Sequence, residues 1–203
     1  PHRRPVLHEL GVDELRSRRV SSAAIDAVRR RQSHAVVTDA APTHAELLPL
    51  VQAAASAADH GALHPWRLIE LRGDARVRLG EAFVAESKLV GSDAQRLAEK
   101  PLRASLLIAV VARHEPSFKV AEWEQDAAAS GIAHLLSLLL AEAGWGVMWR
   151  TGGHTRSTAV RAVHQLADNE KLLGWLYVGG VPEDGASKPP RTPIDPEDYL
   201  TVL

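Results

Sequence analysis

Residues 29–34 read RRRQSH and combine the side chains that proteins use to hold a phosphate group. An arginine guanidinium offers forked, charged donors, and the hydroxyl of Ser33 adds a neutral one. Each charge-assisted hydrogen bond to such an anion is worth roughly 1.5–3 kcal/mol. The same residues also suit a plain basic helix end, because positive charge near a helix C-terminus interacts favourably with the helix dipole. This segment by itself leaves both interpretations open.

Two further segments have the composition of a site for a flat ligand. Residues 55–66, ASAADHGALHPW, begin with small side chains that let a planar ring approach the backbone. Residues 149–153, WRTGG, close a short apolar stretch with an aromatic ring, a cation and two glycines. Glycine has no Cβ, so a ligand can approach the main chain closely there. Taken separately, the first segment is a loop with a stiff exit, and Trp66 and Trp149 are equally well explained as core side chains.

Several common chemistries are excluded by what the sequence lacks. It contains no cysteine, which removes thiolate nucleophiles, zinc–cysteine sites and disulfides, and we expect a cytoplasmic location. The nucleophile elbow, the Walker phosphate loop and the dinucleotide-binding glycine pattern are missing. His60 and His64 stand four residues apart, but Gly61 and Pro65 disfavour the helix that a metal-binding pair at that spacing requires. We therefore predict no metal site.

The charge balance indicates neither a nucleic acid nor a membrane as partner. There are 24 basic and 25 acidic residues, for a formal net charge of −1. Residues 1–34 hold a local excess of arginine, so nucleic-acid binding there is an alternative, although no aromatic side chains interleave with the basic ones. The most apolar stretch, residues 127–143, is shorter than the roughly 20 residues that a bilayer requires. We interpret it as a buried core helix.

Periodicity and capping residues predict the elements that would position these segments. Thr43 with Glu46 makes a capping box, and the apolar run at 104–112 is typical of a strand covered on both faces. The predicted helices span residues 21–32, 43–57, a segment capped by Asp74, 121–143 and 157–166. The predicted strands span residues 66–71, 104–112, 145–150 and 172–180. Helices and strands are mixed without a repeat or a long linker, which indicates one α+β or α/β domain with a central sheet.

Six short motifs, in this order, resemble the nitroreductase family of FMN-dependent flavoproteins, and within it the minimal YdjA-like subgroup of NAD(P)H nitroreductases. They are RQS (31–33), APT (41–43), AADHGALHPW (57–66), KVAEWEQD (119–126), WRTG (149–152) and GWLYVG (174–179). The resemblance covers residues 22–202. It implies an α+β nitroreductase-like fold, with a central, mostly antiparallel sheet flanked by helices in an interlocked homodimer. Residues 1–20 would then be an amino-terminal extension and 21–203 the FMN-binding domain.

The resemblance also implies a site and a reaction. The cofactor-binding residues that it implies are Arg31, Gln32 and Ser33 at the ribityl phosphate, Arg150, Thr151 and Gly152 at the ring, and Ser56 and His60 from the partner chain. Hydride would pass from NAD(P)H through flavin N5 to a nitroaromatic, quinone or similar acceptor in a ping-pong reaction. No side chain need act as nucleophile or acid, so we predict no catalytic residue.

The chain departs from the family pattern at positions expected near the flavin. Gln32 stands in place of an arginine, and Arg30 or Arg191 could compensate for the lost charge. Further departures are Ser56, Gly61 and His64. If these changes weaken flavin binding, an alternative function is a flavin-binding module for storage or sensing, without turnover. Trp123 and Glu124 are interpreted as a helix start and as packing, and are not included in the site.

Overall fold

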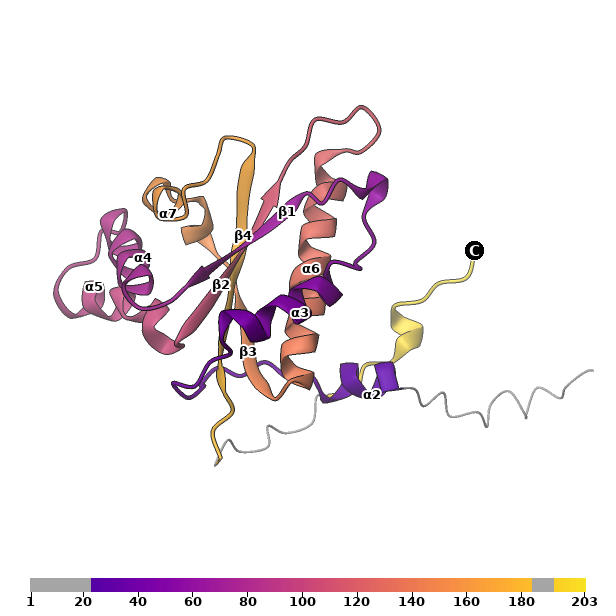
Figure 1. Ribbon diagram of the computed structural model, residues 1–203, viewed down its shortest axis with the longest axis horizontal. Coiled ribbons are helices and arrows are strands. Elements are labelled where there is room, and N and C mark those ends of the chain that lie inside the picture. The colour runs from indigo at the N-terminus through magenta and orange to yellow at the C-terminus, as the bar shows by residue number, and fades with distance from the viewer. Residues whose placement is uncertain (1–22, 184–191) are drawn as a thin grey trace, which may run out of the picture.

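An antiparallel sheet of four strands lies at the centre of the chain, with helices on both of its faces (Figure 1). The computed structural model describes residues 23–183 and 192–203. The strands are β1 (Trp66–Leu71), β2 (Leu106–Arg113), β3 (Trp145–Arg150) and β4 (Glu170–Gly180). The α-helices are α2 (Ala23–Arg30), α3 (His44–Ala54), α4 (Asp74–Ala85), α5 (Gly91–Ala98), α6 (Glu122–Glu142) and α7 (Thr158–Val163). The described residues also form the 3₁₀ turns η1 (His60–Ala62), η2 (Lys100–Arg103), η3 (Gly153–Arg156) and η4 (Pro196–Asp198).

The strand order is β1-β2-β4-β3, and every neighbouring pair is antiparallel. This confirms the α+β class and the central antiparallel sheet that the sequence predicts. The register between β2 and β4 shifts beside Val110, which pairs with Gly174, whereas Val111 pairs with Leu172. One residue of β4 is therefore extra at this bulge, and the strand bends next to the end of β3.

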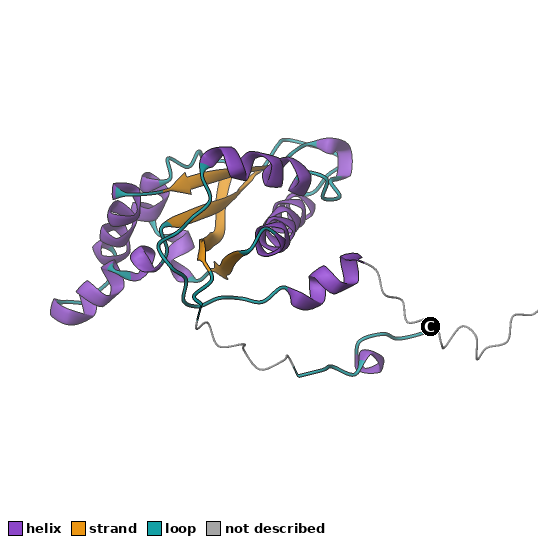
Figure 2. Cartoon of the chain, turned by 60° about the horizontal axis from the view of Figure 1, so that its bottom comes forward, coloured by secondary structure: helices purple, strands orange, loops and turns teal. Residues whose placement is uncertain are grey.

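Both faces of the sheet are covered, as the apolar run of β2 predicts. Residues 106–112 of β2 are all buried, and alternate residues enter two separate cores. One core lies under α4, α5 and α7 and includes Leu79, Phe83 and Trp175. The other lies under α3 and α6 and includes Ile132 and Leu136. Figure 2 shows the sheet between these two helical layers.

Local signals located most helices, although several predicted boundaries are wrong. The Thr43 capping box is present, with Glu46 Oε2 accepting from the Thr43 amide at 2.7 Å, but α3 ends at Ala54 and not near 57. Asp74 is not a cap, because it is the first residue of α4 and Gly73 precedes it as the N-cap. The first helix ends at Arg30 instead of 32, and its predicted start at 21–22 lies outside the described residues. Helix α7 ends at Val163, earlier than predicted.

Two features of the helices follow from tertiary packing. Helix α5 was not predicted, because its eight residues contain a single buried side chain, Leu97. It packs so closely on α4 that a Cβ at Gly80 would lie 2.0 Å from the carbonyl oxygen of Ala98. Helix α6 matches its predicted span of 121–143 within one residue at each end. Within the described ranges, no helix has both the length and the apolar character needed to cross a bilayer.

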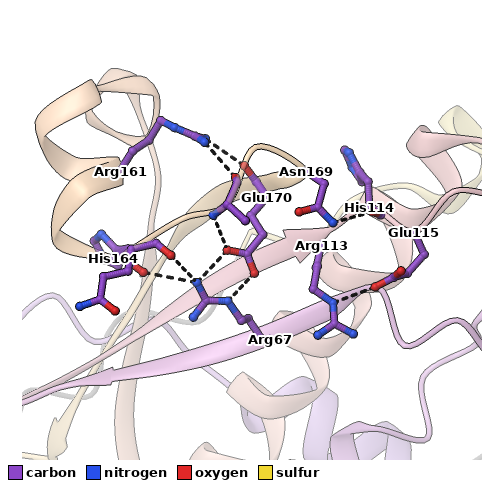
Figure 3. Close-up of polar contacts among 10 residues, drawn as sticks. Arg67, Arg113, His114, Glu115, Arg161, His164, Asn169 and Glu170 are labelled. Atoms are coloured by element: carbon purple, nitrogen blue, oxygen red, sulfur yellow. Dashed lines mark hydrogen bonds and ion pairs between the residues drawn. The ribbon is translucent and has the colours of Figure 1, made fainter.

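An ion pair and hydrogen bonds from Arg67 hold the turn between α7 and β4 against β1. Arg67 on β1 donates to both carboxylate oxygens of Glu170, the second contact being 2.8 Å, and to the carbonyl oxygens of His164 and Gln165 (Figure 3). Arg161 donates to the Glu170 carbonyl oxygen at 2.9 Å. The Arg67 guanidinium holds the pKa of the Glu170 carboxyl below its usual value. Because Glu170 is buried, removing Arg67 would leave a charge without compensation.

Two hydrogen bonds hold the buried side chain of His164 in one protonation state. The Trp175 Nε1–H donates to Nε2 of His164 at 3.0 Å, and Nδ1 of His164 lies 2.8 Å from the Val160 carbonyl oxygen. The ring is therefore neutral, with its proton on Nδ1. Burial lowers the pKa of His164 from its ordinary value.

We expect folding stability to fall as the pH drops from about 7.5 to 5.5. The unfolded chain takes up a proton near the ordinary histidine pKa of about 6.5, whereas the folded chain, with His164 at a lowered pKa, does not. The contribution is complete above about 6.5 and is lost as the pH falls through the lowered pKa. His164→Gln should reduce the slope. Denaturant unfolding at both pH values measures this, and equal slopes in wild type and His164→Gln would contradict it.

Candidate functional site

The predicted phosphate segment lies beside β3. Residues 31–33 follow the end of α2 and are partly buried, and the Arg31 amide still donates to the Ala27 carbonyl oxygen at 3.0 Å. The His34 amide donates to the Val147 carbonyl oxygen at 2.9 Å. Further along, a pair of 2.8 Å backbone bonds ties residues 38–40 to Gly180. This segment is therefore held by backbone bonds to the edge strand β3 and to the end of β4.

Arg150 ends β3 and faces the same segment. Its guanidinium lies over the ring of Tyr177, with Cζ 5.1 Å from the ring centroid, and one nitrogen is 3.5 Å from the Ala35 carbonyl oxygen. The buried Nε of Arg150 has no hydrogen-bond partner among the described residues. Burial raises the pKa of Tyr177 to about 12, although the nearby cations Arg150 and Arg103 oppose this rise. Tyr177 is therefore a neutral platform for the Arg150 cation.

A cavity of about 590 Å³ opens at this place, lined by Ala35, Val36, Arg103, Met148 and Arg150. The cavity therefore lies between Ala35 and Val36, which directly follow the phosphate segment, and Arg150 at the end of β3. Arg103 was not singled out from the sequence, because it reaches the cavity from η2, a turn with no pattern of its own. A larger cavity of about 880 Å³ lies elsewhere, between the start of α6 and the turn before β4. None of the predicted site residues lines the larger cavity.

The turn after Arg150 is open and depends on glycine. Thr151 and Gly152 are exposed, and Gly152 has φ +123, a conformation that other residues rarely adopt. No atom lies within 4 Å of where a Cβ would stand on Gly152. The buried Thr155 holds the turn from inside, because its hydroxyl donates to the Gly152 carbonyl oxygen at 2.8 Å. Thr155 is a second residue that the sequence alone did not identify.

Ser56 and His60 lie elsewhere in the chain. Both are exposed; Ser56 follows the end of α3, and His60 opens the turn η1. Nδ1 of His60 lies 2.8 Å from Oε2 of Glu124, on the first turn of α6. The sequence indicates for Glu124 only a helix start, and no local signal links it to a residue 64 positions away.

The structure therefore does not bring the predicted residues together within one chain. The phosphate segment adjoins the end of α6, where Arg30 binds Glu142 at 2.7 Å, and His60 adjoins its beginning at Glu124. These two glutamates are 18 residues apart, which corresponds to about 27 Å along a helix axis. In Figure 1 the two groups lie at opposite ends of α6. The ion pair with Glu142 also occupies Arg30, which was one of the two residues expected to compensate for Gln32. The other, Arg191, lies outside the described residues.

The residues at the end of β3 fit a flavin. A reduced isoalloxazine ring carries negative charge and polar edges, so it calls for a cation, free donors and an approach without Cβ atoms. Arg150 supplies the cation, the buried Nε1 of Trp149 and Nε of Arg150 have no acceptor within the described chain, and Gly152 leaves open space. A metal fits less well, because no three His, Asp or Glu side chains of the described ranges gather in a suitable group.

Comparison with known proteins identifies the family. The sequence model described as "Nitroreductase family" matches residues 28–180. The chain belongs to the nitroreductase family. It is 30% identical, over 183 residues, to the Escherichia coli (strain K12) protein named "Putative NAD(P)H nitroreductase YdjA", covering 89% of this chain and 99% of the relative. Membership of this family supports an oxidoreductase activity.

Solved structures show the same nitroreductase fold. The nitroreductase-like family protein from Bacillus cereus superposes with a TM-score of 0.75 at 21% identity, covering 90% of this chain and 97% of that one. The FMN and NADPH-dependent nitroreductase NfnB from Sphigopyxis sp. strain HMH gives a TM-score of 0.70 at 17% identity, covering 90% of this chain and 99% of that one. The fold implied by the sequence motifs is thereby confirmed.

We predict that Gly174 is indispensable for closing the end of β3. A Cβ there would lie 2.4 Å from the Arg150 carbonyl oxygen and 2.7 Å from Trp149 Nε1, at φ +141. Gly174→Ala should cost about 3 kcal/mol of folding free energy, because left-handed strain and overpacking add. Gly144→Ala is the matched control: its φ is also positive, at +87, but no atom lies within 4 Å, so about 1 kcal/mol is expected. Denaturant unfolding of both variants measures the difference, and equal losses would contradict the steric argument.

Proposed function

We propose that the chain is an FMN-dependent oxidoreductase that transfers hydride from NAD(P)H to nitroaromatic, quinone or similar electrophilic acceptors by a ping-pong mechanism, in the cytoplasm. The observation that carries this proposal is the end of β3, where a buried arginine nitrogen without a partner among the described residues adjoins an open glycine turn. Bound FMN would supply N5 as the atom that accepts and then delivers the hydride. The protein's part is to bind, orient and charge-stabilise that ring.

At the phosphate end, Arg31, Gln32 and Ser33 would bind the ribityl phosphate. Their position directly after α2 and beside β3 supports this, because the segment is fixed by the His34–Val147 backbone bond. Arg103 adds a cation at the cavity that this segment borders. It would take the compensating role expected of Arg30 or Arg191, since the Arg30 guanidinium is paired with Glu142.

At the ring end, Arg150, Thr151 and Gly152 would face the isoalloxazine. Hydride transfer leaves one extra negative charge on the ring, so a fixed guanidinium nearby stabilises the reduced form. Tyr177 keeps that guanidinium in place through the cation–π contact. The exposed main chain at Gly152 can approach the ring because no side chain intervenes.

A second copy of the chain would complete the site with the partner subunit's Ser56 and the partner subunit's His60. The distance of about 27 Å along α6 supports this homodimer, since one chain cannot place both groups around one flavin. Exposed apolar side chains in the last described segment give further support. They are Ile194, Tyr199, Leu200, Val202 and Leu203. This segment lies away from the sheet in Figure 2, which supports a second chain as its partner.

A flavin-binding module without turnover is the second candidate. One observation favours it: Gln32 removes a charge from the phosphate segment, and the pairing of Arg30 with Glu142 prevents the simplest compensation. Weaker phosphate binding would suit storage or delivery of FMN. Reduction of the bound flavin by NAD(P)H distinguishes the two candidates.

We expect the purified protein to bind FMN and the bound FMN to be reduced by NAD(P)H under anaerobic conditions. Calorimetry and the visible absorbance spectrum measure the two steps. With NADPH and a nitrofuran as substrates, double-reciprocal plots should be parallel, because the reduced nicotinamide leaves before the acceptor binds. Binding without reduction would favour the second candidate, and absence of any heat with FMN would refute both.

A mixing experiment tests whether the site is shared between two chains. One chain carries Arg31→Ala with Ser33→Ala and the other carries His60→Ala; each homodimer should bind FMN at least tenfold more weakly, given about 1.5–3 kcal/mol per lost charged hydrogen bond. In a co-expressed mixture, half of the dimers are mixed and each has one native site. About a quarter of the native capacity for tight FMN binding should therefore return. No recovery would place both groups of residues in the same chain.

A further inference from the structure

Glu124 is held at both of its carboxylate oxygens. Oε2 lies 2.8 Å from Nδ1 of His60, and Oε1 accepts from the Ala121 amide at 3.2 Å, one turn earlier at the start of α6. Both contacts hold the pKa of the Glu124 carboxyl below its usual value. The carboxylate is thus ionised and fixed, and it points at an imidazole from a different part of the chain.

The loop that carries His60 adopts a strained backbone against α6. Gly61, Ala62 and His64 have positive φ angles of +77, +50 and +47. For residues other than glycine this conformation is sterically unfavourable, and such strain concentrates at functional sites. Asp59 supports the loop, because its side chain accepts from the His64 amide at 2.7 Å. An added Cβ on Gly61 would already lie 3.4 Å from the Val120 side chain, so the loop is packed closely on the start of α6.

The contact with Glu124 determines which ring nitrogen of His60 is available. An ionised carboxylate only accepts, so Nδ1 carries a proton and donates to it. Nε2 makes no hydrogen bond to any described residue, and the side chain is 56% exposed. The other charged or titratable groups on this loop and on the first turns of α6 are Asp59, His64, Lys119, Glu122 and Asp126, the last of which pairs with Lys171 and His114. Asp59 is engaged by the loop backbone, and Glu122 lies on the opposite side of α6, because two residues turn a helix by about 200°.

We propose that Glu124 is a positioning residue that holds the His60 ring by Nδ1, with its Nε2 directed at the flavin bound by the partner subunit. This inference rests on the proposed function, which places His60 at that flavin. Hydride transfer adds two electrons and one proton to the ring and so leaves one negative charge. A hydrogen-bonding imidazole held there in a fixed orientation favours the reduced form, whereas a freely rotating imidazole does so less.

The sign of the effect separates this role from simple electrostatics. If Glu124 acted only through its own negative charge, its removal would favour the reduced flavin and raise the two-electron midpoint potential. If it acts by orienting the His60 imidazole, its removal lowers that potential. Glu124→Gln is the suitable variant, because glutamine also serves at this position of a helix start and can still accept from the Ala121 amide.

The experiment measures the midpoint potential of bound FMN by spectroelectrochemistry at pH 7.5. The proteins are wild type, Glu124→Gln, His60→Gln, the double variant and Glu122→Gln. The last is the matched control, because it removes the same charge from the same turn of α6 without touching His60. FMN dissociation constants and melting temperatures are measured in parallel.

We expect Glu124→Gln and His60→Gln each to weaken the preference for reduced over oxidised FMN about tenfold, which is about 30 mV for a two-electron couple. The double variant should fall no further, because the two residues act as one unit. Glu122→Gln should leave the potential unchanged or slightly higher.

An unchanged or raised potential in Glu124→Gln would overturn the positioning role while FMN binding stands. If Glu124→Gln fails to fold, an unchanged potential in His60→Gln overturns it equally, since that variant leaves α6 intact. Failure of the wild type to bind FMN refutes the proposed function itself, and the inference with it.

Discussion

Helix α6 keeps two groups of polar residues apart, because a hydrogen-bonded helix of twenty-one residues is a stiff rod of about 32 Å. At its beginning, Glu124 holds the loop of His60, and at its end, Glu142 holds Arg30 next to the phosphate segment. Both anchors are ion pairs to side chains from other parts of the chain. The length of this helix therefore supports the proposal that two chains contribute to one flavin site.

The sheet positions the third part of the candidate site, the residues Arg150 to Gly152 at the end of β3. This strand is at the edge, and the His34 amide binds its Val147, whereas residues 38–40 bind Gly180 at the end of β4. The bulge in β4 and the glycine at 174 let residues 149–151 close against the neighbouring strand. Irregular backbone is tolerated here because β2 and β4 form a well-packed double-faced core behind it. The Arg150 cation and the open turn at Gly152 are thus held by strands that pack in the core.

The sequence predicted those parts of the fold whose signals are local. The apolar run of β2 and the long apolar face of α6 were located within one or two residues, because burial on several sides leaves an unambiguous pattern. The capping box of Thr43 was correct for the same reason. Helix ends without a cap were overextended, and α5 was missed, because an eight-residue helix with one buried side chain has almost no periodicity to detect. Asp74 was misjudged because a side chain that suits the N-cap suits the first helical turn equally well.

For the candidate site, the sequence by itself determined the residue types: arginine and serine after the first helix, a histidine in a small-residue loop, and arginine followed by glycine after a short strand. Those motifs, in order, were sufficient to indicate the family. Only the tertiary structure decided which of them lie together. It set Arg150 on Tyr177, brought Arg103 to the same cavity, paired His60 with Glu124, and placed the two groups at opposite ends of α6. The reason is physical: pairing across tens of residues depends on the path of the folded backbone, and no short-range preference encodes that path.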